Sequence, residues 1–98
     1  MTSDWQSLSV LLAGSGSIGK RHARVLTALG VRDIRVCDPN PAQIEGLLKD
    51  CPSVRPVASY EAGLQEKPAT VFILTPPKMH VPMAVQAIER ADWGQTYK

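Results

Sequence analysis

Short apolar runs alternate along the chain with longer stretches whose apolar residues recur at the spacing of a helix. The first run, LSVLLAG at residues 8–14, is apolar almost throughout, which predicts a strand with both faces buried. The next stretch predicts a helix over residues 18–29, and Gly30 ends it. The apolar face expected of this helix consists of Ile18, His22, Val25, Leu26 and Leu29.

A second strand followed by a second helix is predicted next along the chain. Residues 33–38, DIRVCD, alternate between polar and apolar side chains and predict a strand. Asn40 and Pro41 then provide an N-cap and a first helical position, where proline is well tolerated. The apolar stripe of this second helix consists of Ile44, Leu47 and Leu48.

The second half of the chain repeats this order. Residues 54–57, VRPV, predict a short strand near an edge of the sheet, because Pro56 has no N–H to donate to a central ladder. Residues 59–67 predict a short helix. The run ATVFIL at residues 69–74 predicts a central strand, and after the turn TPPK a last helix is expected over residues 80–91. The apolar stripe of that helix consists of Val81, Ala84, Val85, Ile88 and Ala91.

Four repeats of strand and helix define the fold class. Right-handed crossovers turn this order into an α/β fold, a Rossmann-type doubly wound parallel sheet of about four strands. We expect one domain over residues 1–91. The tail at residues 92–98, DWGQTYK, has neither the length nor the alternation of a fifth strand. The fourth strand would then have an open edge, through which we expect the chain to self-associate.

A glycine motif lies between the first strand and the first helix. The sequence GSGSIG at residues 14–19 has the spacing GxGxxG, in the position that a dinucleotide site requires. Gly14 permits a tight turn, Gly16 lets a pyrophosphate approach the backbone, and Gly19 lets the helix pack closely on the strand. The helix dipole and the free N–H groups at the helix start favour phosphate. The residues predicted to bind the cofactor here are Gly14, Ser15, Gly16, Ser17, Ile18 and Gly19.

A carboxylate at the end of the second strand completes this candidate site. Asp38 lies 24 residues after Gly14, near the spacing of about twenty at which an acidic residue binds the adenosine ribose. It would repel a 2′-phosphate, and the sequence DPNP has no arginine to receive one, so we expect NAD as the cofactor in preference to NADP. Two alternatives stay open. Asp38 is only the cap of the next helix, since Asp before Pro is a common turn residue, or the motif belongs to a Rossmann-like methyltransferase.

Charge and composition narrow the classes of function. The 98 residues carry a net charge of +2, and the basic residues are spread along the chain, so we expect no nucleic-acid partner. Lys20, Arg21 and Arg24 favour a solvated helix face over a phosphate clamp. Without a long apolar run or a signal-peptide pattern, no membrane partner and a cytoplasmic location are expected. Cys37 and Cys51 lack CxxC spacing, which predicts two reduced thiols, at least one of them in the core, and no metal site.

Two segments resemble a known family. GSGSIGKRHARVL at residues 14–26 and VFILTPPKMHVPMAVQAIE at residues 71–89 are similar to the NAD(P)-binding domain of the glucose–fructose oxidoreductase, inositol dehydrogenase and rhizopine-catabolism (Gfo/Idh/MocA) oxidoreductases. The resemblance implies that the turn after the fourth strand lies beside the nicotinamide half of the cofactor. The residues it adds to the predicted site are Thr75, Pro76, Pro77 and His80.

Alternative interpretations of the turn in this second segment and of His22 stay open. Pro76 and Pro77 would equally suit a rigid turn with no ligand. His22 matches the family's GxGxxGxxH pattern, and we expect it to be buried on its helix and bonded to a backbone group rather than to a ligand.

The resemblance covers about residues 9–89 and then stops. The family's pattern continues with a fifth strand, a Glu-Lys-Pro motif whose lysine helps in catalysis, and a large sheet domain, whereas this sequence ends in QTYK. We therefore expect a truncated chain that binds nucleotide weakly and is inactive by itself, derived from an enzyme of sugars or polyols. The alternative is a non-catalytic nucleotide-sensing module, although the pattern predicts no large exposed apolar stripe for a partner.

Overall fold

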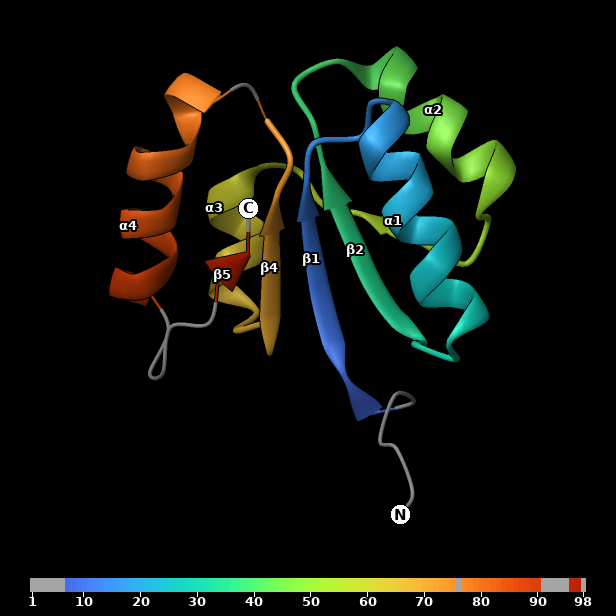
Figure 1. The fold of residues 1–98 in the computed structure, drawn as a ribbon, viewed down its shortest axis with the longest axis horizontal. Helices are drawn as coiled ribbons and strands as arrows, with labels where there is room; N and C mark the ends of the chain where they lie inside the picture. Colours follow the sequence, from blue (N-terminus) through green and yellow to red (C-terminus); the bar gives the residue numbers. More distant parts are fainter. Residues whose placement is uncertain (1–6, 76, 91–95, 98) are drawn as a thin grey trace.

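The computed structural model describes residues 7–75, 77–90 and 96–97, and it confirms the alternation of strands and helices (Figure 1). Each predicted element is present within a few residues of its expected bounds. In chain order the elements are β1 (Ser9–Ala13), α1 (Ser17–Ala28), β2 (Asp33–Cys37), α2 (Pro41–Asp50), β3 (Arg55–Pro56), α3 (Tyr60–Gln65), β4 (Thr70–Ile73), the 3₁₀ turn η2 (Pro77–Met79), α4 (His80–Arg90) and β5 (Thr96–Tyr97).

The sheet is parallel throughout, with the strand order β3-β2-β1-β4-β5. The chain moves outward from β1 to β3, then crosses back to place β4 on the other side of β1. Helices α1 and α2 cover one face of the sheet, and α3 and α4 cover the other (Figure 1). The order reverses between β1 and β4, and in open α/β sheets ligands bind outside the carboxyl ends of the strands at this switch point. The predicted doubly wound fold is confirmed.

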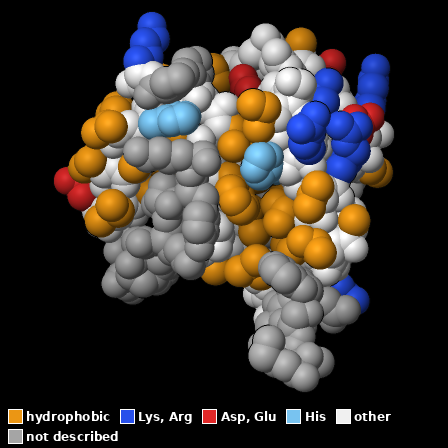
Figure 2. All heavy atoms as spheres, viewed as in Figure 1, with side chains coloured by type: hydrophobic (Ala, Val, Ile, Leu, Met, Phe, Trp, Pro, Cys, Tyr) orange, Lys and Arg blue, Asp and Glu red, His pale blue; other side chains and the backbone are white. Residues whose placement is uncertain are grey.

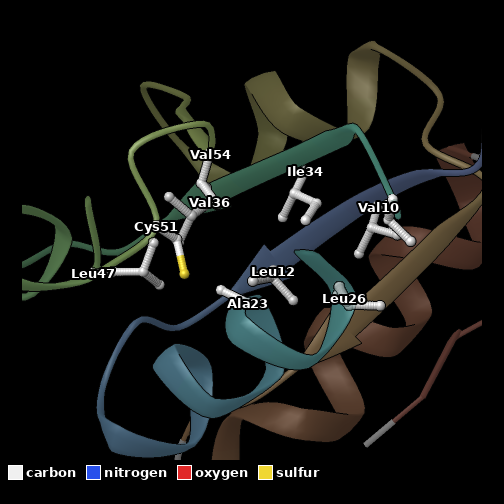
Figure 3. Close-up of a cluster of buried hydrophobic side chains, with 10 residues drawn as sticks. Val10, Leu12, Ala23, Leu26, Ile34, Val36, Leu47, Cys51 and Val54 are labelled. Carbon is white, nitrogen blue, oxygen red and sulfur yellow. The ribbon is translucent and has the colours of Figure 1, made fainter. Parts of the chain in front are cut away.

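Alternate residues of β1 supply the two cores. Val10 and Leu12 face α1 and α2, whereas Leu11 and Ala13 face α3 and α4, and all four are at most 1% exposed. Figure 3 shows the first of these cores, in which side chains of β1, β2 and α1 point toward one another. A strand buried on both faces fixes the position of its carboxyl end, where the glycine motif begins.

The end of the chain differs from the expectation. Thr96 and Tyr97 form a fifth strand that pairs with Val71 and Phe72 of β4. The sheet therefore has five strands, and the expectation of a fully open edge on β4 is wrong over these two residues. A strand of two residues is too short for its alternation to be visible in the sequence. Self-association stays a prediction.

The buried face of α1 also differs from the predicted one. Gly19, Ala23 and Leu26 face the sheet, whereas Ile18 and Val25 are more than half exposed. The small side chains bring the helix close to the sheet and turn its larger apolar stripe outward.

On α4, Val81, Val85 and Ile88 are exposed in the same way, although Ala87 is buried. The expectation that the chain presents no large apolar stripe is therefore wrong. In Figure 2 hydrophobic side chains lie along the left side, where α4 runs, and a second group lies in the middle of the face, between α4 and α1.

Candidate functional site

The glycine loop is a three-residue connection whose first residue is hydrogen-bonded to β2, and the residue before it accepts from the segment after β4. Gly14 has a φ of +119°, a conformation that side chains with a Cβ rarely adopt. Its N–H donates to the carbonyl oxygen of Cys37 in β2 (2.9 Å), and the N–H of Leu74 donates to Ala13 (2.8 Å). The loop is therefore held in place at the switch point by β2 and by the end of β4.

The second and third glycines of the motif have different reasons to lack a side chain. A Cβ on Gly19 would run into the carbonyl oxygen of Gly14, so this glycine is required by the contact between α1 and the loop. Gly16 is the N-cap of α1, and a Cβ there would meet no atom of the chain within 4 Å. The protein's own packing does not require glycine at this position, and the space above it is open to a ligand.

Asp38 is bonded directly to the glycine loop. Its Oδ2 accepts hydrogen bonds from the N–H of Ser15 (2.8 Å) and from the Ser15 hydroxyl (2.9 Å), and its Oδ1 accepts from the N–H of Asn40 (2.8 Å). Asn40 itself caps α2 by accepting from the N–H of Ala42 (3.1 Å). Asn40 and not Asp38 is therefore the cap of α2, so the alternative that Asp38 is only that cap is wrong. Asp38 joins the turn before α2 to the loop after β1.

A cavity of about 250 Å³ lies beside this pair. Its walls come from the carboxyl ends of β1 and β2, from the segment that enters α3, from the turn after β4 and from α4. The lining residues are Ala13, Gly14, Cys37, Asp38, Pro39, Ala58, Ser59, Tyr60, Thr75 and Met83. Three residues predicted from sequence, Gly14, Asp38 and Thr75, therefore meet in one cavity.

Two ionisable groups in this cavity are held in their neutral forms. Burial, and then the charge of Asp38, raise the pKa of the Cys37 thiol from 9.0 to about 12. Burial, and then Cys37, raise the pKa of the Tyr60 phenol from 10.0 to about 12, and its hydroxyl donates to the carbonyl oxygen of Met83 (2.6 Å). At neutral pH the cavity therefore presents an uncharged wall opposite one carboxylate.

These pKa values predict a loss of stability in alkali. The unfolded chain releases the protons of Cys37 and Tyr60 near pH 9 and 10, whereas the folded chain holds them to about pH 12. The unfolded state then binds fewer protons, so the free energy of unfolding falls as the pH rises from about 9 to about 12. Urea unfolding at several pH values should show this fall, and Tyr60→Phe should make it shallower above pH 10. Equal slopes in the variant and the parent chain would contradict the assignment to Tyr60.

The turn after β4 is hydrogen-bonded to residues of α4. The half-buried Thr75 donates its hydroxyl to the sulfur of Met83 (3.2 Å). The Nε2 of His80 donates to the Thr75 carbonyl oxygen (2.6 Å), which makes His80 a support of Thr75 rather than a lining residue. Pro77 begins η2, and Pro76 lies outside the described residues.

His22 and Arg24 of α1 have structural partners. His22 donates from Nδ1 to the carbonyl oxygen of Ile18 (2.9 Å), which confirms the expected backbone bond, although its ring is half-buried rather than buried. Arg24 pairs with Asp50 on the surface (3.5 Å), and the ammonium of Lys20 reaches over Gly46 of α2. Ion pairs this exposed contribute little to stability.

Sequence reasoning missed one side of the cavity. Ala58, Ser59 and Tyr60 follow β3, and Met83 lies on α4. The carboxyl ends of parallel strands share one edge of the sheet, so the segment after residues 54–57 was a signal for the first three. Met83 had no such signal, because its place depends on how α4 packs across the sheet.

Over residues 7–75, 77–90 and 96–97, no cluster of three His, Cys, Asp or Glu side chains could hold a metal ion. Cys37 and Cys51 are both free and buried, as expected. None of the helices within these described ranges is long and apolar enough to cross a membrane.

A parallel sheet with a glycine loop and a strand-end carboxylate at its switch point defines a dinucleotide-binding Rossmann domain. Residues 8–92 match the model of the GFO_IDH_MocA oxidoreductase family, NAD-binding Rossmann fold. The chain belongs to this family and is its NAD(P)-binding domain. Because this is a family of oxidoreductases, the alternative that the motif belongs to a methyltransferase is wrong. Among curated proteins no significant match was found.

Solved structures of proteins in complex with NAD share the fold. Prephenate dehydrogenase from A. aeolicus, solved with hydroxyphenyl propionate and NAD+, aligns with a TM-score of 0.78 and 21% identity over 97% of this chain and 34% of its own. GenD2 from gentamicin A biosynthesis, in complex with NAD, aligns with a TM-score of 0.73 and 28% identity over 85% of this chain and 24% of its own. A D-isomer specific 2-hydroxyacid dehydrogenase from Lactobacillus delbrueckii ssp. bulgaricus, complexed with NAD, aligns with a TM-score of 0.70 and 19% identity. This alignment covers 97% of this chain and 27% of the dehydrogenase chain. The chain thus spans a quarter to a third of these proteins.

Proposed function

We propose that the chain binds NAD(H), in preference to NADP(H), across the carboxyl ends of β1, β2 and β4. Residues 14–19 would hold the pyrophosphate and Asp38 the adenosine ribose. The turn at Thr75, Pro76 and Pro77 would lie beside the nicotinamide half, with His80 as its support. The observation that carries the proposal is the bond between Asp38 and Ser15, because it joins a carboxylate to the phosphate-binding loop at the cavity.

The residues at the site fit a dinucleotide. The open space over Gly16 would admit a pyrophosphate close to the backbone, where the start of α1 provides free N–H groups and a favourable dipole. The first turn of α1 contains no acidic residue that would repel phosphate. The neutral wall around Cys37 and Tyr60 suits the apolar parts of a nucleotide.

The preference for NAD(H) rests on the charge at the end of β2. A 2′-phosphate on the adenosine ribose would meet the Asp38 carboxylate, and like charges brought together in this way cost several kcal/mol. The three residues after Asp38 are Pro39, Asn40 and Pro41, so this turn supplies no cation for the phosphate.

In a complete family member the bound nicotinamide would accept or donate a hydride. The task of the 98 residues is to bind the cofactor and to orient its nicotinamide end through the turn at Thr75. We propose that the whole protein is an oxidoreductase of sugars or polyols, in line with the family to which the chain belongs.

Calorimetric titration with NADH and NADPH tests the proposal. The chain should bind NADH at least about tenfold more tightly than NADPH. Asp38→Ala should weaken NADH binding by roughly tenfold, the value of a hydrogen bond to a charged group, and should abolish the preference. Asp50→Ala removes a carboxylate that pairs with Arg24 outside the cavity, and it should leave both affinities unchanged.

Because Asp38→Ala also leaves the Ser15 hydroxyl without its acceptor, urea unfolding should first establish that the variant is folded. A folded chain that binds neither cofactor, or that binds NADPH as tightly as NADH, would contradict the proposal.

A further inference from the structure

The carboxylate of Asp38 is almost fully used by the protein itself. Oδ2 accepts two hydrogen bonds, both from Ser15, and Oδ1 accepts one from the N–H of Asn40. An ionised carboxylate offers about four acceptor positions, two on each oxygen. Oδ2 is therefore filled, and one position remains on Oδ1.

Ser15 occupies both acceptor positions of the Asp38 Oδ2 atom. The residue is fully buried, so water has no direct access to its hydroxyl. Its backbone N–H and its hydroxyl donate to the same oxygen at 2.8 and 2.9 Å. The backbone N–H fixes the carboxylate relative to the glycine loop, and the hydroxyl takes the second acceptor position on that oxygen.

We propose that Ser15 is a positioning residue that restricts Asp38 to one hydroxyl of the adenosine ribose. Because the loop occupies Oδ2, only Oδ1 can accept a hydrogen bond from the ligand. Asp38 therefore binds one of the two ribose hydroxyls and makes no hydrogen bond to the other. This inference rests on the proposed function, in which Asp38 faces that ribose, and it names the group that sets how Asp38 recognises it.

The experiment compares NADH with its analogues that lack the 2′- or the 3′-hydroxyl on the adenosine ribose, each titrated into the 98-residue chain. One analogue should bind at least about tenfold more weakly than NADH, because it loses a hydrogen bond to a charged group. The other should bind within about twofold of NADH. Comparable losses with both analogues, or a loss with neither, would overturn the inference.

Ser15→Ala tests the part played by the hydroxyl. The substitution frees an acceptor position on Oδ2, so the analogue that had bound like NADH should now bind several-fold more weakly than NADH. Ser53→Ala is the matched control, because Ser53 is exposed between α2 and β3 and lies outside the cavity. This control should keep the pattern of the parent chain.

A double substitution separates positioning from a general effect on the fold. If Ser15 acts through Asp38, then Ser15→Ala should change NADH affinity in the parent chain and leave it unchanged in an Asp38→Ala background. Equal changes in the two backgrounds would overturn the inference.

The proposed function fails in a different way. It fails if the folded parent chain binds no NADH, and this inference then fails with it. Normal NADH binding with comparable losses for both analogues would leave the proposed function standing and overturn only the role of Ser15.

Discussion

Replacing Gly16 with alanine is expected to weaken NADH binding by roughly 10- to 100-fold while the fold persists. Gly16 has a φ of −69°, which alanine adopts without strain, and its Cβ would meet no atom of the chain. The free energy of unfolding should therefore change by no more than about 1 kcal/mol. The added methyl group would occupy the space through which a pyrophosphate reaches the backbone, and such overpacking costs about 1–3 kcal/mol.

Calorimetry with NADH and urea unfolding measure the two effects separately. Gly46→Ala is the matched control, since its Cβ would touch only the flexible end of Lys20 on a neighbouring helix. It should leave NADH affinity unchanged. A Gly16→Ala chain that binds NADH like the parent would show that this space is not the pyrophosphate site.

Replacing Gly19 with alanine is expected to have the opposite result, a large loss of stability. Its Cβ would collide with the carbonyl oxygen of Gly14, which is backbone and cannot rotate away. The loop cannot easily retreat, because Gly14 is bonded to Cys37 and the preceding Ala13 to Leu74. We expect a cost of about 2–4 kcal/mol, a large part of the 5–15 kcal/mol typical of a domain.

The loss should appear as a lower midpoint of urea unfolding and as a melting temperature lower by about 10 °C or more. Gly16→Ala serves as the comparison within the same motif. A Gly19→Ala chain with the midpoint of the parent would contradict the close contact between α1 and the loop.

The contrast between these glycines shows what the motif alone could predict. The spacing of residues 14–19 correctly located the turn between β1 and α1. It also assigned Gly16 to the approach of a pyrophosphate and Gly19 to close packing of the helix. It could not show that the close contact of Gly19 is with the carbonyl oxygen of Gly14, because that depends on which atoms surround each Cα.

The fold was predictable wherever one pattern dominated a segment. Continuous apolar runs predicted β1 and β4, and Asn40 with Pro41 predicted the start of α2. On α1 the pattern was ambiguous, because small residues on one side and large apolar residues on the other each form a stripe. Periodicity finds a stripe without telling which face of the helix the sheet covers.

The sequence predicted which site residues lie at the ends of the strands, but not the hydrogen bonds that join them. The spacing from Gly14 to Asp38 indicated a carboxylate near the loop. The bond from Ser15 to that carboxylate joins residues 23 apart in the chain, and it depends on β1 and β2 pairing with Ala13 opposite Cys37. Such a contact follows from the register of the sheet, and β1 is apolar on both faces, so its own pattern of residues does not fix that register.

The most direct test of the central claim is to titrate the isotopically labelled chain with NADH and follow its backbone amide signals by NMR. The account predicts saturable shifts concentrated in residues 14–19, 37–40, 58–60 and 75, with little change in residues 46–55 at the end of α2 and in β3. Shifts absent from the glycine loop and from Asp38, or spread evenly over the chain, would contradict a dinucleotide site at the carboxyl ends of the strands.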